Sequence, residues 1–274
     1  MAFLTTRPVQ CGHHPLRRSF DGGQWKIDQR DVGRLAFESP ALLGGQAARR
    51  GLSCSSCHLN GRGNADFHIE GVSGEAGTAD VTLNLFSKVR GDGTFNPVSI
   101  PDVAARDGHQ IKDRKSQAFR EKVHGLIVEE FDGQEPPPYI FEAVIDYLDA
   151  LDIGECPDRA ARVKVGLSDD LDAATAALDY AAWLSGEGDA MSARLMARVA
   201  RSRLERIHER FDGISLTRER AALEAASRDI EAWSAGPGRG EAIRTRLDGL
   251  AAMLGPAEAR SLYDPEVLRA ALGR

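Results

Sequence analysis

Aromatic residues are scarce in this sequence and make up only 6% of its 274 residues. We therefore expect something bulky and apolar that is not an amino acid to help fill the core. No stretch reaches the roughly 18 apolar residues that a membrane-spanning helix needs. Positive charge is not in excess either, because 35 Lys and Arg against 41 Asp and Glu give a net charge of −6. The chain thus has no electrostatic reason to bind nucleic acid or an anionic membrane.

Cysteine is also rare, with residues at positions 11, 54, 57 and 156. Two of them form the segment Cys54-Ser55-Ser56-Cys57-His58, the C-x-x-C-H pattern that attaches haem c. Residues three apart share one face of a helical turn, so both thiols can reach the two vinyl groups on one haem edge. The next residue, His58, is then aimed at the iron as the proximal ligand. The sequence therefore predicts one covalently attached haem c.

Other uses of this segment compete with haem. A redox-active C-x-x-C of the thioredoxin kind needs a β-α-β context, which the sequence pattern does not indicate. A zinc site needs two further ligands, and Cys11 with His13 or His14 could supply them. Haem is the preferred interpretation because the residues on both sides of the motif agree with it.

The residues before the motif resemble the N-terminal helix and attachment loop of class I cytochromes c. In that family, G-x-x-x-F precedes two further glycines and C-x-x-C-H-x-x-G. The matching positions here are Gly33, Phe37, Gly44, Gly51, Cys54, Cys57, His58 and Gly61. The resemblance implies a helical haem domain whose first and last helices cross.

The residues after the motif resemble a related family. Residues 91–103 are similar to the F-R-T-P-S-L-R-N-V stretch of bacterial di-haem cytochrome c peroxidases and methylamine-utilisation di-haem enzymes, through Phe95, Ser99, Ile100 and Val103. Those enzymes carry two C-x-x-C-H motifs and a Met shortly after the stretch. This chain has one such motif and no Met between Met1 and Met191. A peroxidase-like enzyme, or its electron-donating half, is therefore the alternative to an electron carrier.

The expected fold is all-α, with a cytochrome c-like haem domain followed by a helical bundle. Residues 1–30 are expected to form an irregular N-terminal arm, residues 31–155 the haem domain and residues 156–274 the helical C-terminal domain. Residues 59–101 are rich in Gly, Asn and Asp, as is typical of a long loop around a cofactor.

Helix signals are clear in both expected domains. Ser116 is expected to begin one helix, and Pro136, Pro137 and Pro138 the next. In the C-terminal part, Ser168 and Thr217 are expected to cap helices, and a short helix is expected after Asp264-Pro265. Four or five helices with short loops suggest an antiparallel bundle.

The sixth position of the iron has several candidate ligands. His109 lies close to where the resembling peroxidases carry their Met, and we expect it to be the second metal ligand beside His58. The alternatives are an open position or one of His68, His124, Met191 and Met196. An open position with a distal acid or base would suit peroxide chemistry, and Glu70 and Glu75 are the candidates for that role.

Three basic residues, Arg62, Lys88 and Arg90, are expected to neutralise the haem propionates. Cys11 and Cys156 stand just outside the two ends of the expected haem domain. Because the first and last helices cross in class I cytochromes, these two cysteines are also candidates for a disulfide, with two unrelated thiols as the alternative.

The function expected from these features is one-electron transfer by a single-haem c-type cytochrome, with a redox protein as its partner. A peroxidase-like haem enzyme and a haem-based sensor or binding module are the alternatives. Because haem c is attached outside the bacterial cytoplasm, we expect a periplasmic or exported protein. The start Met1-Ala-Phe-Leu-Thr-Thr-Arg lacks the pattern of a signal peptide, so we expect an upstream start or a processed chain.

Overall fold

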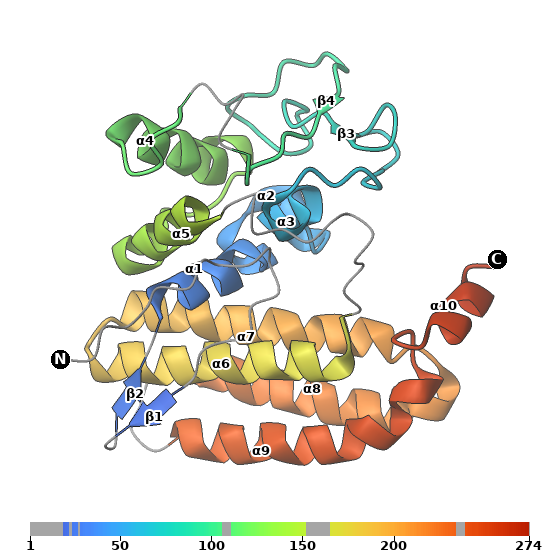
Figure 1. Ribbon diagram of the computed structural model, residues 1–274. Helices are drawn as coiled ribbons and strands as arrows, with labels where there is room; N and C mark the ends of the chain where they lie inside the picture. Colours follow the sequence, from blue (N-terminus) through green and yellow to red (C-terminus); the bar gives the residue numbers. More distant parts are fainter. Residues whose placement is uncertain are drawn as a thin grey trace. The chain divides into compact units, whose positions relative to one another are not determined.

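The computed structural model describes residues 19–21, 24–26, 28–105, 111–151, 165–233 and 239–273. The chain divides into two compact units, and each is described by itself. The described part of unit 1 is residues 28–105 and 111–151, and that of unit 2 is residues 19–21, 24–26, 165–233 and 239–273. The described chain is mostly helical, as expected of an all-α protein (Figure 1). Among the described helices, none combines the length and the apolar character needed to cross a membrane.

Unit 1 is built from short helices joined by long loops (Figure 1). Its helical elements are α1 (Gln29–Phe37), η1 (Pro40–Leu42), α2 (Gly45–Arg49), α3 (Cys54–Cys57), η2 (Leu59–Gly61), α4 (Gln117–Gly125), the π-helical turn η3 (Leu126–Glu130) and α5 (Pro138–Ala150). Two short strands, β3 (Thr78–Ala79) and β4 (Val98–Ser99), pair antiparallel with Ala79 opposite Val98. This pair joins the middle of the long loop, residues 59–101, to a segment near its end.

The first and last helices of unit 1, α1 and α5, pack against each other. Gly33 lies at the contact, where an added Cβ atom would stand only 1.9 Å from the carbonyl oxygen of Ala143. Only glycine lets the two backbones approach this closely. Val32, Leu35 and Ile140 are fully buried beside it. Hydrophobic burial along this contact forms one part of the unit's core.

The helix that follows the long loop begins where the sequence predicts. The hydroxyl of Ser116 accepts a hydrogen bond from the N–H of Phe119 at 3.2 Å, so Ser116 is the N-cap of α4. The helix then widens into η3, and α5 begins at Pro138 after an extended Pro137. The π-helical turn places Glu130 and Phe131 beside the loop that carries Phe86.

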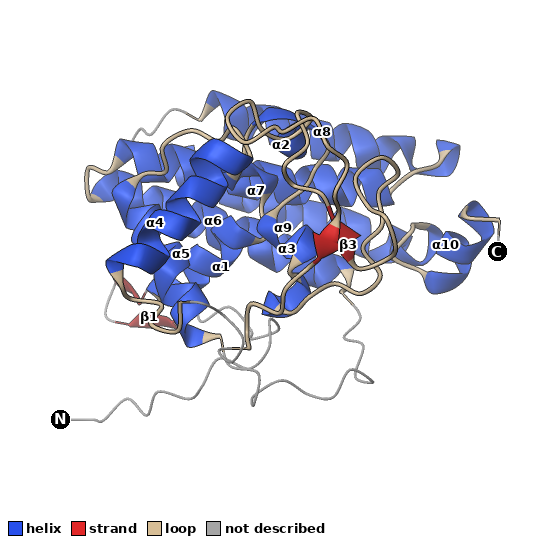
Figure 2. Cartoon of the chain, turned by 90° about the horizontal axis from the view of Figure 1, so that it is seen from above, coloured by secondary structure: helices blue, strands red, loops and turns tan. Residues whose placement is uncertain are grey.

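Unit 2 is a bundle of long helices, shown from two directions in Figures 1 and 2. Its elements are α6 (Leu167–Gly186), α7 (Ala190–Arg210), η5 (Ile214–Leu216), α8 (Thr217–Ala232), α9 (Arg239–Leu254), η6 (Gly255–Arg260) and α10 (Pro265–Ala271). Packing of α6 on α7, α7 on α8, α8 on α9 and α9 on α6 closes the bundle. A small hairpin of β1 (Ser19–Asp21) and β2 (Gln24–Lys26) belongs to this unit, within the segment that the sequence predicts to be irregular.

Two helices of unit 2 begin earlier than the sequence predicts, and one is α8, whose N-cap is Leu216 rather than Thr217. The N-cap of α6 is Gly166 rather than Ser168. The N–H of Gly166 donates to the carboxylate of Asp169 at 2.7 Å, and the N–H of Leu167 donates to Glu258 at 3.1 Å. Because carboxylates accept hydrogen bonds from these two N–H groups, the helix begins before Ser168. The short helix expected after Asp264-Pro265 is α10, which begins at Pro265 with Asp264 as its N-cap.

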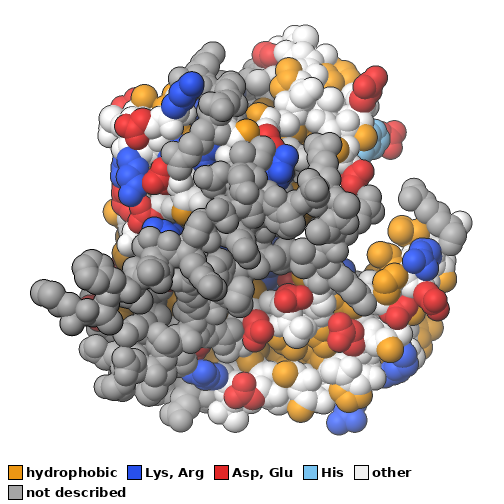
Figure 3. Space-filling view, viewed as in Figure 1, with side chains coloured by type: hydrophobic (Ala, Val, Ile, Leu, Met, Phe, Trp, Pro, Cys, Tyr) orange, Lys and Arg blue, Asp and Glu red, His pale blue; other side chains and the backbone are white. Residues whose placement is uncertain are grey.

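The interior of unit 2 holds one buried ionic cluster. Asp170 is 1% exposed and accepts a hydrogen bond from the Tyr263 hydroxyl at 2.7 Å. Its other carboxylate oxygen lies 3.4 Å from Arg203 and 3.5 Å from Arg206. Outside the core, acidic and basic side chains are interspersed on the described part of the face in Figure 3.

Candidate functional site

The C-x-x-C-H motif forms a single helical turn, α3, that local hydrogen bonds hold in place. The N–H of Ser53 donates to the hydroxyl of Ser56 at 3.0 Å at the start of the turn. The N–H of His58 donates to the carbonyl of Cys54 at 2.8 Å at its end. The side chain of Asn64 donates to the carbonyl of Ser56 at 2.9 Å. Both cysteines therefore lie on the same face of a fixed turn.

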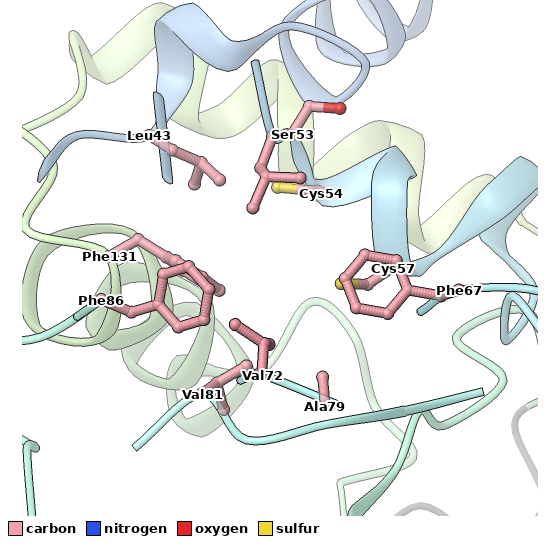
Figure 4. Close-up of a pocket in the computed structure, with 11 residues that line it drawn as sticks. Leu43, Ser53, Cys54, Cys57, Phe67, Val72, Ala79, Val81, Phe86 and Phe131 are labelled. Atoms are coloured by element: carbon pink, nitrogen blue, oxygen red, sulfur yellow. The ribbon is translucent and has the colours of Figure 1, made fainter. Parts of the chain in front are cut away.

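Both thiols line one apolar cavity in unit 1, with about 370 Å³ of space between its lining atoms, part of it open to solvent. Figure 4 shows the two sulfur atoms pointing into this space, with Phe86 and Phe131 across from them. The lining residues are Leu43, Leu52, Ser53, Cys54, Cys57, Phe67, Val72, Ala79, Val81, Phe86 and Phe131.

Burial keeps both thiols in their neutral form. It raises the pKa of Cys54 to about 12, to which the neighbouring Cys57 contributes. It raises the pKa of Cys57 to about 11, helped by the negative charge of Glu130. Reactive redox cysteines have lowered pKa values, so this environment does not suit a thioredoxin-like role. Both residues are free cysteines.

A backbone carbonyl at the far end of the long loop orients the imidazole of His58. Its Nδ1 lies 3.1 Å from the carbonyl oxygen of Pro101, 43 residues away. A carbonyl oxygen only accepts hydrogen bonds, so Nδ1 carries the proton and donates. A metal held by this ring would then be bound through Nε2. Histidines that bind metals in proteins regularly donate their second ring N–H in this way.

The chain turns sharply just after His58. Asn60 and Gly61 both have positive φ, at 55° and 72°. A Cβ atom at Gly61 would stand 2.7 Å from the Leu151 side chain, so the turn packs closely on the end of α5. The carbonyl of Gly61 also accepts a hydrogen bond from the N–H of Ala104 at 2.6 Å. Residues 58–61 and 101–104 are therefore fixed to each other.

The residues present fit a covalently bound haem. Two thiols on one face of a turn point into a cavity that is apolar apart from Ser53, and the adjacent imidazole is held through Nδ1. Zinc fits less well, because the described residues contain no group of three His, Cys, Asp or Glu side chains arranged to hold a metal. The other zinc ligands considered, Cys11, His13 and His14, lie outside the described residues, as does the Cys11–Cys156 disulfide.

The three basic residues predicted to neutralise propionates have different surroundings. Arg62 is ion-paired with Asp102, 40 residues away, and joins the motif to the segment that orients His58. Arg90 is ion-paired with Glu129 at 2.9 Å and with the buried Glu130 at 3.0 Å. Lys88 is exposed beside Arg90, and its backbone N–H donates to Asp132 at 3.1 Å. The described residues that line the cavity do not include Arg62, Lys88 or Arg90.

The candidate distal ligands are not gathered at the cavity. His109 lies outside the described residues. His68 is exposed. The Nε2 atom of His124 lies 2.7 Å from the carboxylate of Glu135. Met191 and Met196 lie in unit 2, the first exposed and the second fully buried, and the candidate acids Glu70 and Glu75 are exposed.

Sequence reasoning missed three groups at this site. The carbonyl of Pro101 accepts a hydrogen bond from His58. The negative charge of the buried Glu130 helps to raise the pKa of Cys57. The guanidinium of the buried Arg114 donates to the carbonyl of Val103, two residues after Pro101. A backbone carbonyl leaves no signature in a sequence. Arg114 and Glu130 could have been suspected only as charges beside apolar positions.

No family model matches this chain, and no curated protein or solved structure matches it significantly.

Proposed function

We propose that unit 1 is a c-type cytochrome domain that binds one haem covalently through Cys54 and Cys57, with His58 as the proximal iron ligand. The observation that carries this proposal is the pair of thiols facing one apolar cavity beside an imidazole whose Nδ1 is held by Pro101. The crossing of α1 and α5 at Gly33 also supports the resemblance to class I cytochromes c.

The proposed activity is one-electron transfer. Haem bound at this site would supply an iron that alternates between Fe(III) and Fe(II). The chain would supply the thioether attachments, the proximal imidazole and an apolar cavity. Apolar lining disfavours charge and so helps to set the potential of a bound redox centre.

His109 remains the proposed sixth ligand, and Arg62, Lys88 and Arg90 the proposed propionate partners. Arg62 and Arg90 already hold carboxylates, so binding propionate would require each to share or exchange its partner. We also propose a periplasmic or exported location and a redox protein as the partner.

The test begins with the full chain expressed together with the cytochrome c maturation machinery. Covalent haem is detected by haem staining after denaturing electrophoresis, and the reduced spectrum is then recorded with and without carbon monoxide or cyanide. A stained band and a spectrum inert to both ligands support an electron carrier. Rapid ligand binding would instead favour the peroxidase-like or sensor alternative, and a preparation with zinc and no haem would reject the proposal.

A further inference from the structure

Arg114 is a buried cation whose guanidinium binds three backbone carbonyls. It is 3% exposed, and its guanidinium donates to the carbonyl oxygens of Val103, Leu148 and, at 3.4 Å, Leu151. Burying a guanidinium is costly unless its donors are satisfied, so these bonds determine where the side chain lies.

Two of those carbonyls lie at the C-terminal end of α5, at Leu148 and the capping residue Leu151. Carbonyls in the last turn of a helix lack the usual N–H partner four residues further on, and the Leu148 carbonyl accepts instead from the N–H of Leu151 at 3.4 Å. The partial negative charge at this end also favours a cation. The end of α5 therefore gives Arg114 a firm anchor.

The third carbonyl belongs to the segment that orients His58. Val103 comes two residues after Pro101, whose carbonyl accepts from His58. Between them, Asp102 binds Arg62 with one carboxylate oxygen and the N–H of Ala104, at 3.1 Å, with the other. The segment is thus bonded to the motif on one side and, through Arg114, to α5 on the other.

We propose that Arg114 is a positioning residue for His58: by fixing Val103 to the end of α5, it holds the Pro101 carbonyl where the imidazole needs it. The inference rests on the proposed function, because the direction of the imidazole matters for iron binding. A hydrogen bond from Nδ1 to a carbonyl raises the basicity of the ring and so stabilises Fe(III). Loosening this bond therefore raises the reduction potential.

The rigid fork of Arg114 is what the role requires, since three carbonyls are reached by one planar group. Lysine carries the same charge on a single nitrogen. Arg114→Lys therefore changes the hydrogen-bonding geometry without removing the cation, and separates positioning from a simple electrostatic effect on the iron.

The experiment measures the reduction potential of the haem-loaded chain for the parent, Arg114→Lys and Ile140→Val. Ile140 is fully buried in the first turn of α5, away from the end that Arg114 holds, so its variant controls for a general loss of packing. We expect Arg114→Lys to raise the Fe(II)/Fe(III) ratio at a fixed potential about threefold, or about 28 mV, since tenfold is 59 mV for one electron. Ile140→Val should keep the parent potential.

An unchanged potential in Arg114→Lys, or an equal shift in Ile140→Val, overturns the positioning role. A parent chain without covalent haem rejects the proposed function instead. In that case, nitrogen-15 spectra of the His58 ring in the parent and in Arg114→Lys decide the inference. Loss of the Nδ1-protonated tautomer in the variant supports it, and identical spectra overturn it.

Discussion

Unit 2 fills its interior with its own side chains, whereas unit 1 surrounds a cavity that contains two thiols. In unit 2, small residues such as Ala177, Ala181 and Ala200 are fully buried between long helices, and Leu204 and Ile207 fill the space beside them. In unit 1, α1 and α5 form a close contact, but Phe67, Phe86 and Val72 gather around the cavity. Unit 1 should therefore depend on a bound group for its stability, and unit 2 should not.

The largest expected effect comes from removing both thiols. Cys54→Ala with Cys57→Ala should abolish covalent haem attachment completely, because no thioether can form. The measurement is haem staining after denaturing electrophoresis. Unit 1 should also unfold at lower urea than in the parent, while the helical circular dichroism that reports mainly on unit 2 should change little.

A matched control for that variant lies within the same turn. Ser55→Ala removes a hydroxyl that contacts the Ser53 hydroxyl at 2.9 Å but provides no thiol. This variant should retain the haem-stained band. A stained band in the double cysteine variant would show that attachment occurs elsewhere.

The second prediction applies to unit 2 alone. Asp170→Ala leaves Arg203 buried without this carboxylate, and removing one partner of a buried ion pair costs about 3–5 kcal/mol. Urea unfolding followed by circular dichroism measures the loss. Asp172 is exposed on the same helix, so Asp172→Ala should change the unfolding free energy by less than about 0.5 kcal/mol. Equal effects of the two variants would show that the buried cluster does not stabilise the bundle.

The third prediction compares a glycine in each unit. Gly33→Ala forces a methyl group against the Ala143 carbonyl and should destabilise unit 1 by about 1–3 kcal/mol. Gly249 lies within α9 with no atom near its added Cβ, so Gly249→Ala should stabilise unit 2 by about 0.5–1 kcal/mol. Thermal unfolding of the two variants should therefore shift in opposite directions. A neutral Gly33→Ala would mean that α1 and α5 can separate without cost.

Local signals in the sequence were enough to predict several helix starts. The helices expected at Ser116 and at Asp264-Pro265 both form, because in each the side chain of the N-cap residue accepts hydrogen bonds from the N–H groups that follow it. Ser168 was a wrong prediction because Glu258, 91 residues away, satisfies an N–H group before it. Distant partners of this kind have no local pattern.

The same distinction applies to the site. The spacing of Cys54 and Cys57 implies a shared face, and both thiols do line one cavity. The bond between His58 and Pro101 joins residues 43 apart through a backbone oxygen, which no residue type indicates. Arg114 was missed for the same reason, since its guanidinium binds the backbone carbonyls of three apolar residues.

The smallest expected effect concerns Glu130, the acid beside the cavity. Burial raises the pKa of Glu130 above its ordinary value of 4.5, although Arg90 partly opposes the shift. The folded state therefore holds this proton more tightly than the unfolded state. Its contribution to stability is complete below pH 4.5 and is lost as pH rises through the folded-state pKa.

Glu130→Gln removes this titration, so the unfolding free energy of unit 1 should fall less between pH 4.5 and neutrality than in the parent. Urea unfolding at several pH values, followed by haem absorbance, measures the difference. Glu129→Gln also removes a contact with Arg90 but changes an exposed carboxylate, so it controls for the loss of an Arg90 contact. If the Glu130→Gln and parent profiles run parallel, burial beside the cavity does not perturb this acid. The cavity that distinguishes unit 1 from unit 2 would then have no effect on the protonation of Glu130.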